Sequence, residues 1–482
     1  MVGKEQNCVI GAFLTVSSVL VEKGSPRRAI TGFFSVAEFV SEAGSLGKGS
    51  APVMVASTVR PELPFGNDVG SLRHSQFVRF ESTMPPIAHV NIASSEFKAD
   101  PFPFYAQLRS EAPIYRTTLP DKRSVWLVTR YTDVLTVLKD DRFSKDKINA
   151  GTLPWLPGMF KPLLRNMLDV DVPDHTRLRG LVQNVFTARL IENLRERIQD
   201  LADKLLNQVQ AEGRMDLIRD YALQIPTTII AEMLGVPTKD RLKFHRWSNA
   251  AIASTSSRWG VLMALPHAVA FLRYIRMLVK ARRANPEDDL VTALVRAEEA
   301  GDQLSEDELV AMIFLLLVAG HETTVNLIGN GMLALLENPD QISRLRDNPA
   351  LIKAAVEELL RFNGPLETAT ERYTREDTTV AGVTVPRGEL VLAVLASANR
   401  DKQQFEDADR LDLGRESNPH VAFGFGIHYC LGAPLARLEG QIAIATLLRR
   451  IPNLKVAIPS NALRWRRGLV LRGLESLPVT FK

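Results

Sequence analysis

The chain has 482 residues, of which 45% are hydrophobic and 24% are charged, and its formal net charge is +4. These proportions are ordinary for a globular protein with a large core, and so weak a positive charge gives no argument for nucleic-acid binding. The only cysteines, Cys8 and Cys430, lie far apart in the sequence, which excludes a disulfide-stapled secreted fold. We therefore expect a cytoplasmic protein that binds no nucleic acid.

The first 84 residues differ in character from the rest. The apolar run from Cys8 to Val21 is shorter than the about 20 residues that a helix needs to span a bilayer. Residues 41–57 are rich in Gly, Ser and Ala, as linkers are. We expect residues 1–84 to be a poorly ordered N-terminal extension, residues 85–482 to form the working domain, and no segment to cross a membrane.

From Asp100 onward, short strand patterns stand among many helical ones. Alternating β-formers predict strands at residues 114–116, 125–128, 378–381, 383–385 and 390–395, with a turn at 119–122. Helical periodicity covers most of the remaining chain, including 131–139, 174–210 and 221–233. The loop at 151–158 is apolar and is a plausible lid over a pocket. The predicted fold class is mainly α with small β-sheets (α+β).

Asp174 is a suitable N-cap for a helix that carries His175 and Arg179. Residues four apart lie on one helix face, where a His and an Arg can together hold a carboxylate. The alternative is a solvated surface face without a ligand.

The longest helix is predicted between a capping box at Ser305–Glu308 and Asn338. Its centre is apolar all round and should be buried, so Gly320, Glu322 and Thr323 break the local rules there. Such breaks tend to mark functional sites, and Thr323 can hydrogen-bond the carbonyl four residues earlier. A zinc motif is rejected because Val325 stands where the second histidine would be.

The stretch from Phe423 to Gly432 surrounds Cys430 with glycines just ahead of a predicted helix. Backbone N–H groups at a helix N-terminus stabilise negative charge, so we expect a lowered thiol pKa and a ready thiolate. A thiolate is a nucleophile or a metal ligand; the alternative is a buried, inert small hydrophobe.

Farther upstream, Glu358 and Arg361 form either a surface pair or a buried structural one.

Four motifs in this order carry a resemblance to a known family. They are His-x-x-x-Arg from His175, Ala-Gly-x-Glu-Thr from Ala319, Glu-x-x-Arg from Glu358 and Phe-Gly-x-Gly-x-His-x-Cys-x-Gly from Phe423. From about residue 85 to the C-terminus, the chain resembles a cytochrome P450 of the soluble bacterial haem-thiolate type. That resemblance implies a long central helix over a haem with a proximal cysteine loop.

The resemblance implies roles for particular residues. Cys430 would be the thiolate ligand of haem b (iron protoporphyrin IX), and Glu322 with Thr323 would deliver protons to bound O2. Other residues would contact the cofactor: His175, Arg179, Arg372 and His428 at the propionates, Ala319 and Gly320 on the distal face, and Phe423, Gly424 and Gly432 around the sulfur. Glu358, Arg361 and Arg410 would form a buried structural triad that braces the cysteine loop.

The implied activity is a monooxygenase that inserts one oxygen atom of O2 into a hydrophobic small molecule. Its electrons would come from a separate ferredoxin or flavodoxin with its reductase, since no flavin domain is expected in this chain, and the protein would be a monomer. Arg177 is a candidate for attracting an acidic redox partner. The substrate pocket would be lined by residues 155–160, 247–266, 314–323 and 366–370.

Three alternative functions are open. A haem-thiolate enzyme driven by peroxide would not need the Glu322–Thr323 pair. A hydrolase with Cys430 as nucleophile and His428 as base would leave the paired His and Arg motif unexplained. A haem-binding sensor or carrier would need no proton delivery.

Overall fold

The computed structural model describes residues 90–147, 165–241, 243, 247, 258–299 and 304–481. These residues are mostly helical, and their strands form three small sheets, which confirms the predicted fold class. The extension expected over residues 1–84 and the apolar loop expected over 151–158 lie outside the described residues.

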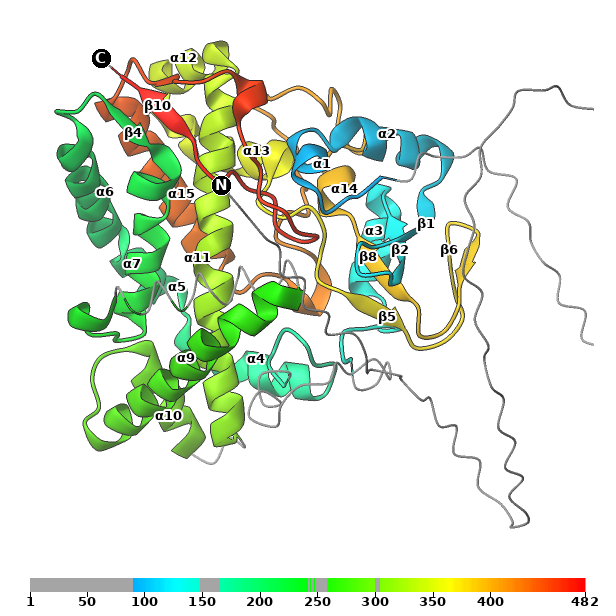
Figure 1. Cartoon of the computed structure of the whole chain (residues 1–482), viewed down its shortest axis with the longest axis horizontal. Helices are drawn as coiled ribbons and strands as arrows, with labels where there is room; N and C mark the ends of the chain where they lie inside the picture. Colours follow the sequence, from blue (N-terminus) through cyan, green and yellow to red (C-terminus); the bar gives the residue numbers. More distant parts are fainter. Residues whose placement is uncertain are drawn as a thin grey trace, which may run out of the picture. The chain divides into compact units, whose positions relative to one another are not determined.

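Helices make up most of the described fold (Figure 1). The α-helices are α1 (Ser95–Ala99), α2 (Phe102–Glu111), α3 (Tyr131–Lys139), α4 (Asp174–Val185), α5 (Ala188–Asn193), α6 (Arg195–Val209), α7 (Gln224–Met233), α9 (Arg258–Ala284), α10 (Leu290–Glu299), α11 (Glu306–Leu336), α12 (Pro339–Asp347), α13 (Ile352–Asn363), α14 (Leu395–Ala398) and α15 (Ala433–Arg450). Shorter helical segments are η2 (Ile218–Ala222), η3 (Thr238–Asp240), η5 (Pro349–Leu351), η6 (Gly426–His428) and η7 (Ser460–Ala462).

Helix α11 is the element around which the other helices gather. It begins with the predicted capping box, in which Ser305 and Glu308 bond each other's backbone N–H groups. It packs against α7, α9, α13 and α15, and Figure 1 shows it running through the middle of the helical part. By length and composition α11 could cross a bilayer, but 61% of its most apolar window is buried inside the fold. Burial by neighbouring helices explains why an all-round apolar helix is stable here.

The largest sheet has the strand order β1-β2-β8-β5-β3. Its strands are β1 (Ile114–Thr118), β2 (Ser124–Val128), β3 (Phe143–Ser144), β5 (Arg372–Thr374) and β8 (Leu390–Ala393). Strand β2 pairs parallel with β8, whereas β1 with β2, β5 with β8, and β3 with β5 pair antiparallel. The sheet lies beside α1, α2 and α3 (Figure 1). It brings β3 and β5, which are more than 200 residues apart in the chain, side by side.

The two other sheets are small. Strands β6 (Thr378–Val380) and β7 (Val383–Val385) form a hairpin, and β4 (Arg214–Asp216), β10 (Pro478–Thr480) and β9 (Lys455–Val456) form the third sheet in that order. The sequence predicted β6 and β7 but missed β3, β4, β5, β9 and β10. Each missed strand has two or three residues, too few for an alternating pattern to be visible, whereas the equally short β6 and β7 were recognised because they flank a turn.

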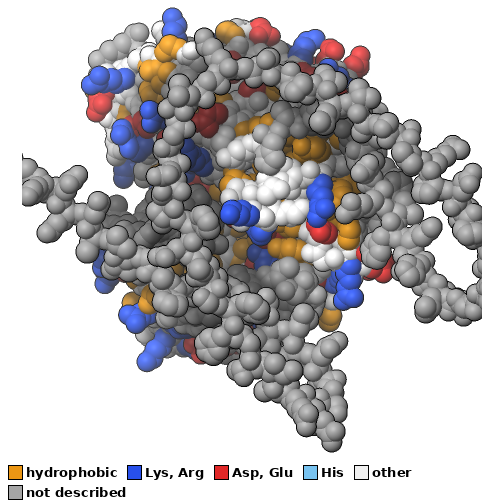
Figure 2. All heavy atoms as spheres, turned by 45° about the vertical axis from the view of Figure 1, so that its right-hand side comes forward, with side chains coloured by type: hydrophobic (Ala, Val, Ile, Leu, Met, Phe, Trp, Pro, Cys, Tyr) orange, Lys and Arg blue, Asp and Glu red, His pale blue; other side chains and the backbone are white. Residues whose placement is uncertain are grey.

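The described surface is mixed in character. On the face shown in Figure 2, Lys and Arg side chains are interspersed with Asp, Glu and apolar ones wherever described residues are visible. Mixed charge of this kind is typical of a soluble globular surface.

Candidate functional site

The loop before α15 folds back on itself around Cys430. The Cys430 N–H donates to the Phe423 carbonyl at 2.9 Å, and Gly424 and Gly426 both have φ of +73°. A Cβ atom at Gly426 would come within 2.9 Å of the Leu138 carbonyl oxygen, so only glycine fits there. The loop is thus built as the sequence predicted, and Cys430 itself is an exposed, unpaired cysteine.

The thiol of Cys430 differs from the expectation in one respect. Its pKa is raised rather than lowered, because the surrounding protein desolvates the sulfur more strongly than nearby donors and charges stabilise a thiolate. The N–H groups of Gly432 and Ala433 and the Arg179 and Arg437 guanidinium groups act in the lowering direction. A cation close to the sulfur would therefore decide whether it is a thiolate.

A polar network between α13 and α15, which the sequence did not reveal, supports the cysteine loop. Glu357 on α13 accepts two hydrogen bonds from Arg437 on α15, at 2.7 and 2.8 Å, and contacts His420 Nε2 at 3.0 Å. Burial alone would raise the pKa of Glu357, but these partners lower it to about 2. The Arg437 guanidinium lies 4.5 Å from the Phe423 ring centroid. The network therefore fixes the aromatic ring that precedes the cysteine.

The buried structural pair expected on α13 forms, with a different third member. Arg361 donates to both Glu358 oxygens at 2.7 Å, and both side chains are buried. The third residue is Arg415, whose Nε lies 3.1 Å from Glu358 Oε2. The prediction of Arg410 was wrong: its side chain is 66% exposed beside Asp407, and only its carbonyl accepts from Arg361. Both arginines lie in one loop, and only the fold selects which of them turns inward.

Four of the predicted cofactor contacts gather from three elements. His175 and Arg179 come from α4, Arg372 from β5 and His428 from η6, and the two histidine rings have centroids 4.2 Å apart. In the part of the chain that the structure describes, both ring nitrogens of His175 and the Nε of Arg372 are buried without a hydrogen-bond partner. Buried donors without partners are rare in folded proteins and call for a ligand.

Lys145 joins this group and was not anticipated. It follows β3, and the register Phe143↔Thr374 and Ser144↔Tyr373, continued by one step, sets it opposite Arg372. The side chain is 2% exposed, and its Nζ donates to the Thr370 hydroxyl. No sequence pattern marks this lysine, because β3 is too short to be recognised. We call Lys145, His175, Arg179, Arg372 and His428 the cationic cluster.

Burial lowers the pKa values throughout the cationic cluster, and repulsion by neighbouring cations adds to this lowering for Lys145, His175 and His428. Burial is the largest cause in each case, and it brings the pKa of Lys145 to about 7, of His175 to about 4 and of His428 to about 2. The same cause lowers the pKa of Arg372 to about 10 and lowers that of Arg179. A cluster of this kind gains most from a bound anion.

Helix α11 presents one partly open stripe in its buried centre. Leu316, Ala319, Gly320 and Thr323 share one face and are exposed or half-buried, whereas His321, Glu322 and Thr324 beside them are buried. Thr323 Oγ1 donates to the Ala319 carbonyl at 3.0 Å, as expected. Small side chains along this stripe leave room for a flat ligand.

Glu322 has a partner that the sequence did not predict. Its carboxylate forms an ion pair with Arg466 from the C-terminal loop, and that arginine also donates to the Leu474 carbonyl at 3.2 Å. Burial nevertheless raises the pKa of Glu322, more than Arg466 lowers it. The buried charge thus has a structural partner as well as a candidate catalytic role.

Arg177 was expected to be available to an acidic redox partner. Its guanidinium instead lies 2.6 Å from Glu308 Oε1 and 3.4 Å from Asp174 Oδ1. The charge of Arg177 is thus already paired within the chain, and its role toward a redox partner stays a prediction.

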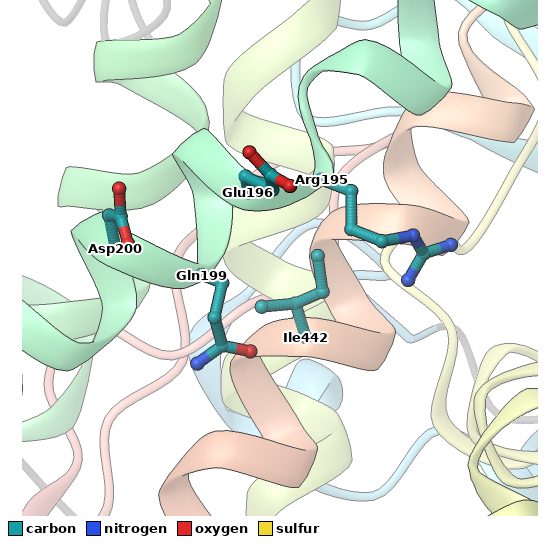
Figure 3. Close-up of a pocket in the computed structure, with 5 residues that line it drawn as sticks. All are labelled: Arg195, Glu196, Gln199, Asp200 and Ile442. Atoms are coloured by element: carbon teal, nitrogen blue, oxygen red, sulfur yellow. The ribbon is translucent and has the colours of Figure 1, made fainter.

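A surface pocket of about 400 Å³ lies between α6 and α15 and is separate from these residues. Figure 3 shows its lining, which is mostly polar side chains from α6 with one apolar residue from α15: Arg195, Glu196, Gln199, Asp200 and Ile442. A binding site for a hydrophobic molecule is usually lined by apolar side chains, so this pocket is not the candidate site.

The described residues fit an iron-bearing, dicarboxylate cofactor such as haem. Cys430 offers a soft metal ligand, the cationic cluster offers buried donors without partners, and α11 offers a stripe of small residues. The wall predicted at 155–160 and residues 248–257 of the wall predicted at 247–266 lie outside the described residues.

Comparison with known proteins agrees with this fit. The family model described as Cytochrome P450 matches residues 85–452. The chain is 46% identical to Cytochrome P450 107B1 of Saccharopolyspora erythraea over 383 residues, which cover 78% of this chain and 93% of that protein. It is 43% identical to Cytochrome P450 monooxygenase PikC of Streptomyces venezuelae over 401 residues, 83% and 95% of the two chains.

A solved structure of a similar protein confirms the overall architecture. The myxobacterial cytochrome P450 CYP267B1 in complex with myristic acid has a TM-score of 0.77 and 44% identity, covering 81% of this chain and 98% of that one.

Proposed function

The chain belongs to the cytochrome P450 family and is a haem-thiolate monooxygenase that uses O2, and on that premise we propose how its residues divide the work. We propose that residues 85–482 form the catalytic domain, that residues 1–84 are an extension, and that the cofactor is haem b. The names of the relatives describe oxygenases, which gives no support to the peroxide-driven, sensor or hydrolase alternatives.

One observation carries this proposal. An exposed cysteine on a glycine-shaped loop shares its site with buried His and Arg nitrogens that have no hydrogen-bond partner among the described residues. A hydrolase would need a base beside the sulfur, but burial and neighbouring cations lower the pKa of His428 to about 2, too low for a base at neutral pH.

Each part of the site then has a task. Cys430 would ligate the iron, and the cationic cluster would hold the two propionates through charge-assisted hydrogen bonds. When bound, haem supplies the iron centre at which O2 is activated and one oxygen atom is transferred to substrate. The Glu357–Arg437 pair keeps Phe423 packed beside the loop, and Glu358 with Arg361 and Arg415 anchors the chain that leads into it.

Proton supply falls to α11. Thr323 has its hydroxyl proton engaged by the Ala319 carbonyl, so it must turn away from that carbonyl before it can donate to a ligand. Glu322 is protonated more readily than an ordinary glutamate because it is buried, and it must leave Arg466 to pass a proton on. These residues therefore hold the protons until a ligand displaces their present partners.

The substrate is a hydrophobic small molecule, such as a polyketide, terpenoid, fatty acid or steroid. The apolar part of α11 and the half-buried Leu366 and Ala369 offer a suitable wall. That CYP267B1 was solved with myristic acid supports this class. Electrons would come from a ferredoxin or flavodoxin with its reductase, and the protein would act as a cytoplasmic monomer.

A carbon monoxide experiment tests the proposal. The purified protein is reduced and exposed to carbon monoxide, and we expect the red-shifted Soret band of thiolate-ligated haem. A colourless protein would refute the haem assignment, and a band of the histidine-ligated type would refute the role of Cys430. Adding peroxide in place of O2 and electrons is the control, and turnover with peroxide alone would support the peroxide-driven alternative.

A further inference from the structure

Lys145 is a buried cation whose charge is not compensated within the described part of the chain. Its own N–H is bonded to Asp171 Oδ1 at 2.9 Å, which fixes the backbone, but the side chain points away to the Thr370 hydroxyl. The other Asp171 oxygen accepts from Ser144 and from Arg375 at 2.7 Å. Asp169 and Asp171 favour the charge from a distance, but neither forms an ion pair with Lys145 among the described residues. A buried ammonium group without a carboxylate partner is costly.

The neighbours of Lys145 make an anionic ligand the simplest explanation. Arg372, which the strand register sets opposite Lys145, repels its ammonium group, and the neighbouring His175 and His428 rings offer no negative charge that would compensate it. Each of these side chains can donate a hydrogen bond, and His175 and Arg372 have buried nitrogens without partners. Carboxylates are anions that such a set of donors can hold through charge-assisted hydrogen bonds.

Two carboxylates could reach Lys145, because it lies between two regions. One side faces the histidines assigned to the haem propionates, and the other faces Thr370, at the end of the predicted substrate wall. We propose that Lys145 binds a carboxylate of a bound small molecule, supplied either by a haem propionate or by an acidic substrate. This inference rests on the proposed haem-binding function, and it assigns a residue to which neither the resemblance nor the comparisons gave a role.

The test compares four haem-loaded proteins: wild type, Lys145→Met, Lys145→Arg and Lys402→Met. Lys402 is 74% exposed, so it is a matched control for loss of one lysine charge. Haem loss is followed by transfer to excess apomyoglobin. Acid binding is followed by Soret titration with myristic acid and with methyl myristate, which lacks the carboxylate. The urea midpoint of each haem-free protein is measured in parallel.

If a propionate is the ligand, Lys145→Met loses haem about tenfold faster, the effect of one charge-assisted hydrogen bond, while the Arg and Lys402 variants match wild type. If a substrate acid is the ligand, haem loss is unchanged, but the preference of wild type for the acid over its ester disappears in Lys145→Met. Unchanged haem loss together with an unchanged acid preference overturns the proposal.

The haem-free proteins separate binding from mere structure. Removing an uncompensated buried charge should raise the urea midpoint of Lys145→Met, whereas a lower midpoint would make Lys145 a structural residue and overturn the proposal. If the Met variant does not accumulate, Lys145→Gln replaces it with the same expectations, since an amide can still bond Thr370. A wild-type protein that takes up no haem would refute the proposed function, while the urea comparison would still test Lys145.

Discussion

Two buried lysines, Lys98 and Lys145, have opposite surroundings. Lys98 lies 2.7 Å from Glu367 Oε2, and Tyr105 donates to the other oxygen of the same carboxylate at 2.5 Å. Lys145 lies among His175, Arg372 and His428, and within the described residues its side chain donates only to a threonine hydroxyl. Burial lowers the pKa of both lysines. The charge of Lys98 is compensated by a carboxylate within the fold, whereas compensation of the Lys145 charge would require a bound anion.

The difference teaches how to separate structural from ligand-binding charges. The network around Lys98 is closed: Arg472 donates to the Lys98 carbonyl and to Asn363, and Thr368 donates to the Leu469 carbonyl. In the cationic cluster the atoms without a partner among the described residues are the Arg372 Nε, which is a donor, and the two ring nitrogens of His175, one of which is a donor in the neutral ring. Buried charges that pair with each other inside the fold serve stability. Buried cationic groups and donors that lack partners mark a binding site for an anion.

The largest expected effect comes from removing Cys430, the proposed ligand of the haem iron whose propionates the cationic cluster would bind. Cys430→Ala should abolish the thiolate Soret band of the reduced carbon monoxide complex, because Cys430 is the only cysteine among the described residues. The visible spectrum measures this directly. A variant that keeps the band would show that the cluster serves another molecule.

The closed network should respond next most strongly. Lys98→Met leaves the buried Glu367 carboxylate without its cation, and we expect a loss of about 3–5 kcal/mol in the free energy of unfolding, with or without haem. Urea denaturation measures it, with Lys402→Met as control. A loss below that of the control would mean that the network is not a stability element.

A smaller effect is expected at the open stripe of α11. Thr323→Ala removes the hydroxyl that is held by the Ala319 carbonyl, and haem and substrate binding should survive. Product formation should fall by about tenfold to a hundredfold, the lower part of the range for a positioned proton donor, with electrons diverted to peroxide or water. Product and peroxide are measured per electron pair consumed; fully coupled turnover would remove Thr323 from the proton route.

Glu439 on α15 is a buried acid to set beside the two buried lysines. Among the described residues, neither of its carboxylate oxygens has a hydrogen-bond partner. Burial raises the pKa of Glu439 to about 8, opposed by the nearby Thr324. The unfolded chain then ionises first, so stability should fall between about pH 4.5 and pH 8, by at most about 1.4 kcal/mol per pH unit. Glu439→Gln should flatten this decline in urea denaturation at several pH values. An equal slope in both proteins would place another group in control.

Local chemistry explains which parts could be predicted from the sequence. The capping box of Ser305 and Glu308 and the glycines around Cys430 act within a few residues, so their structure follows from their spacing. Strands β1 and β2 were found because each has five residues. The resemblance to a known family predicted that Cys430, Glu358 and the long helix belong to one haem site.

Contacts between distant segments were beyond the reach of sequence patterns. Lys145 and Thr370 are 225 residues apart, and Glu322 and Arg466 are 144 apart. The choice of Arg415 over Arg410 depends on how one loop turns, which no periodicity encodes. Sequence patterns therefore identified the elements of the site, and the fold supplied their charge partners.

The loop from Arg466 to Arg472 has a practical consequence for handling this protein. It supplies the counter-charge of Glu322, an acceptor for Lys98 at the Leu469 carbonyl, and the arginine that grips Asn363. Chain ends are usually the first segments that an engineer trims. Here, cutting the chain before Arg466 would remove contacts to the central helix and to the first helices at the same time.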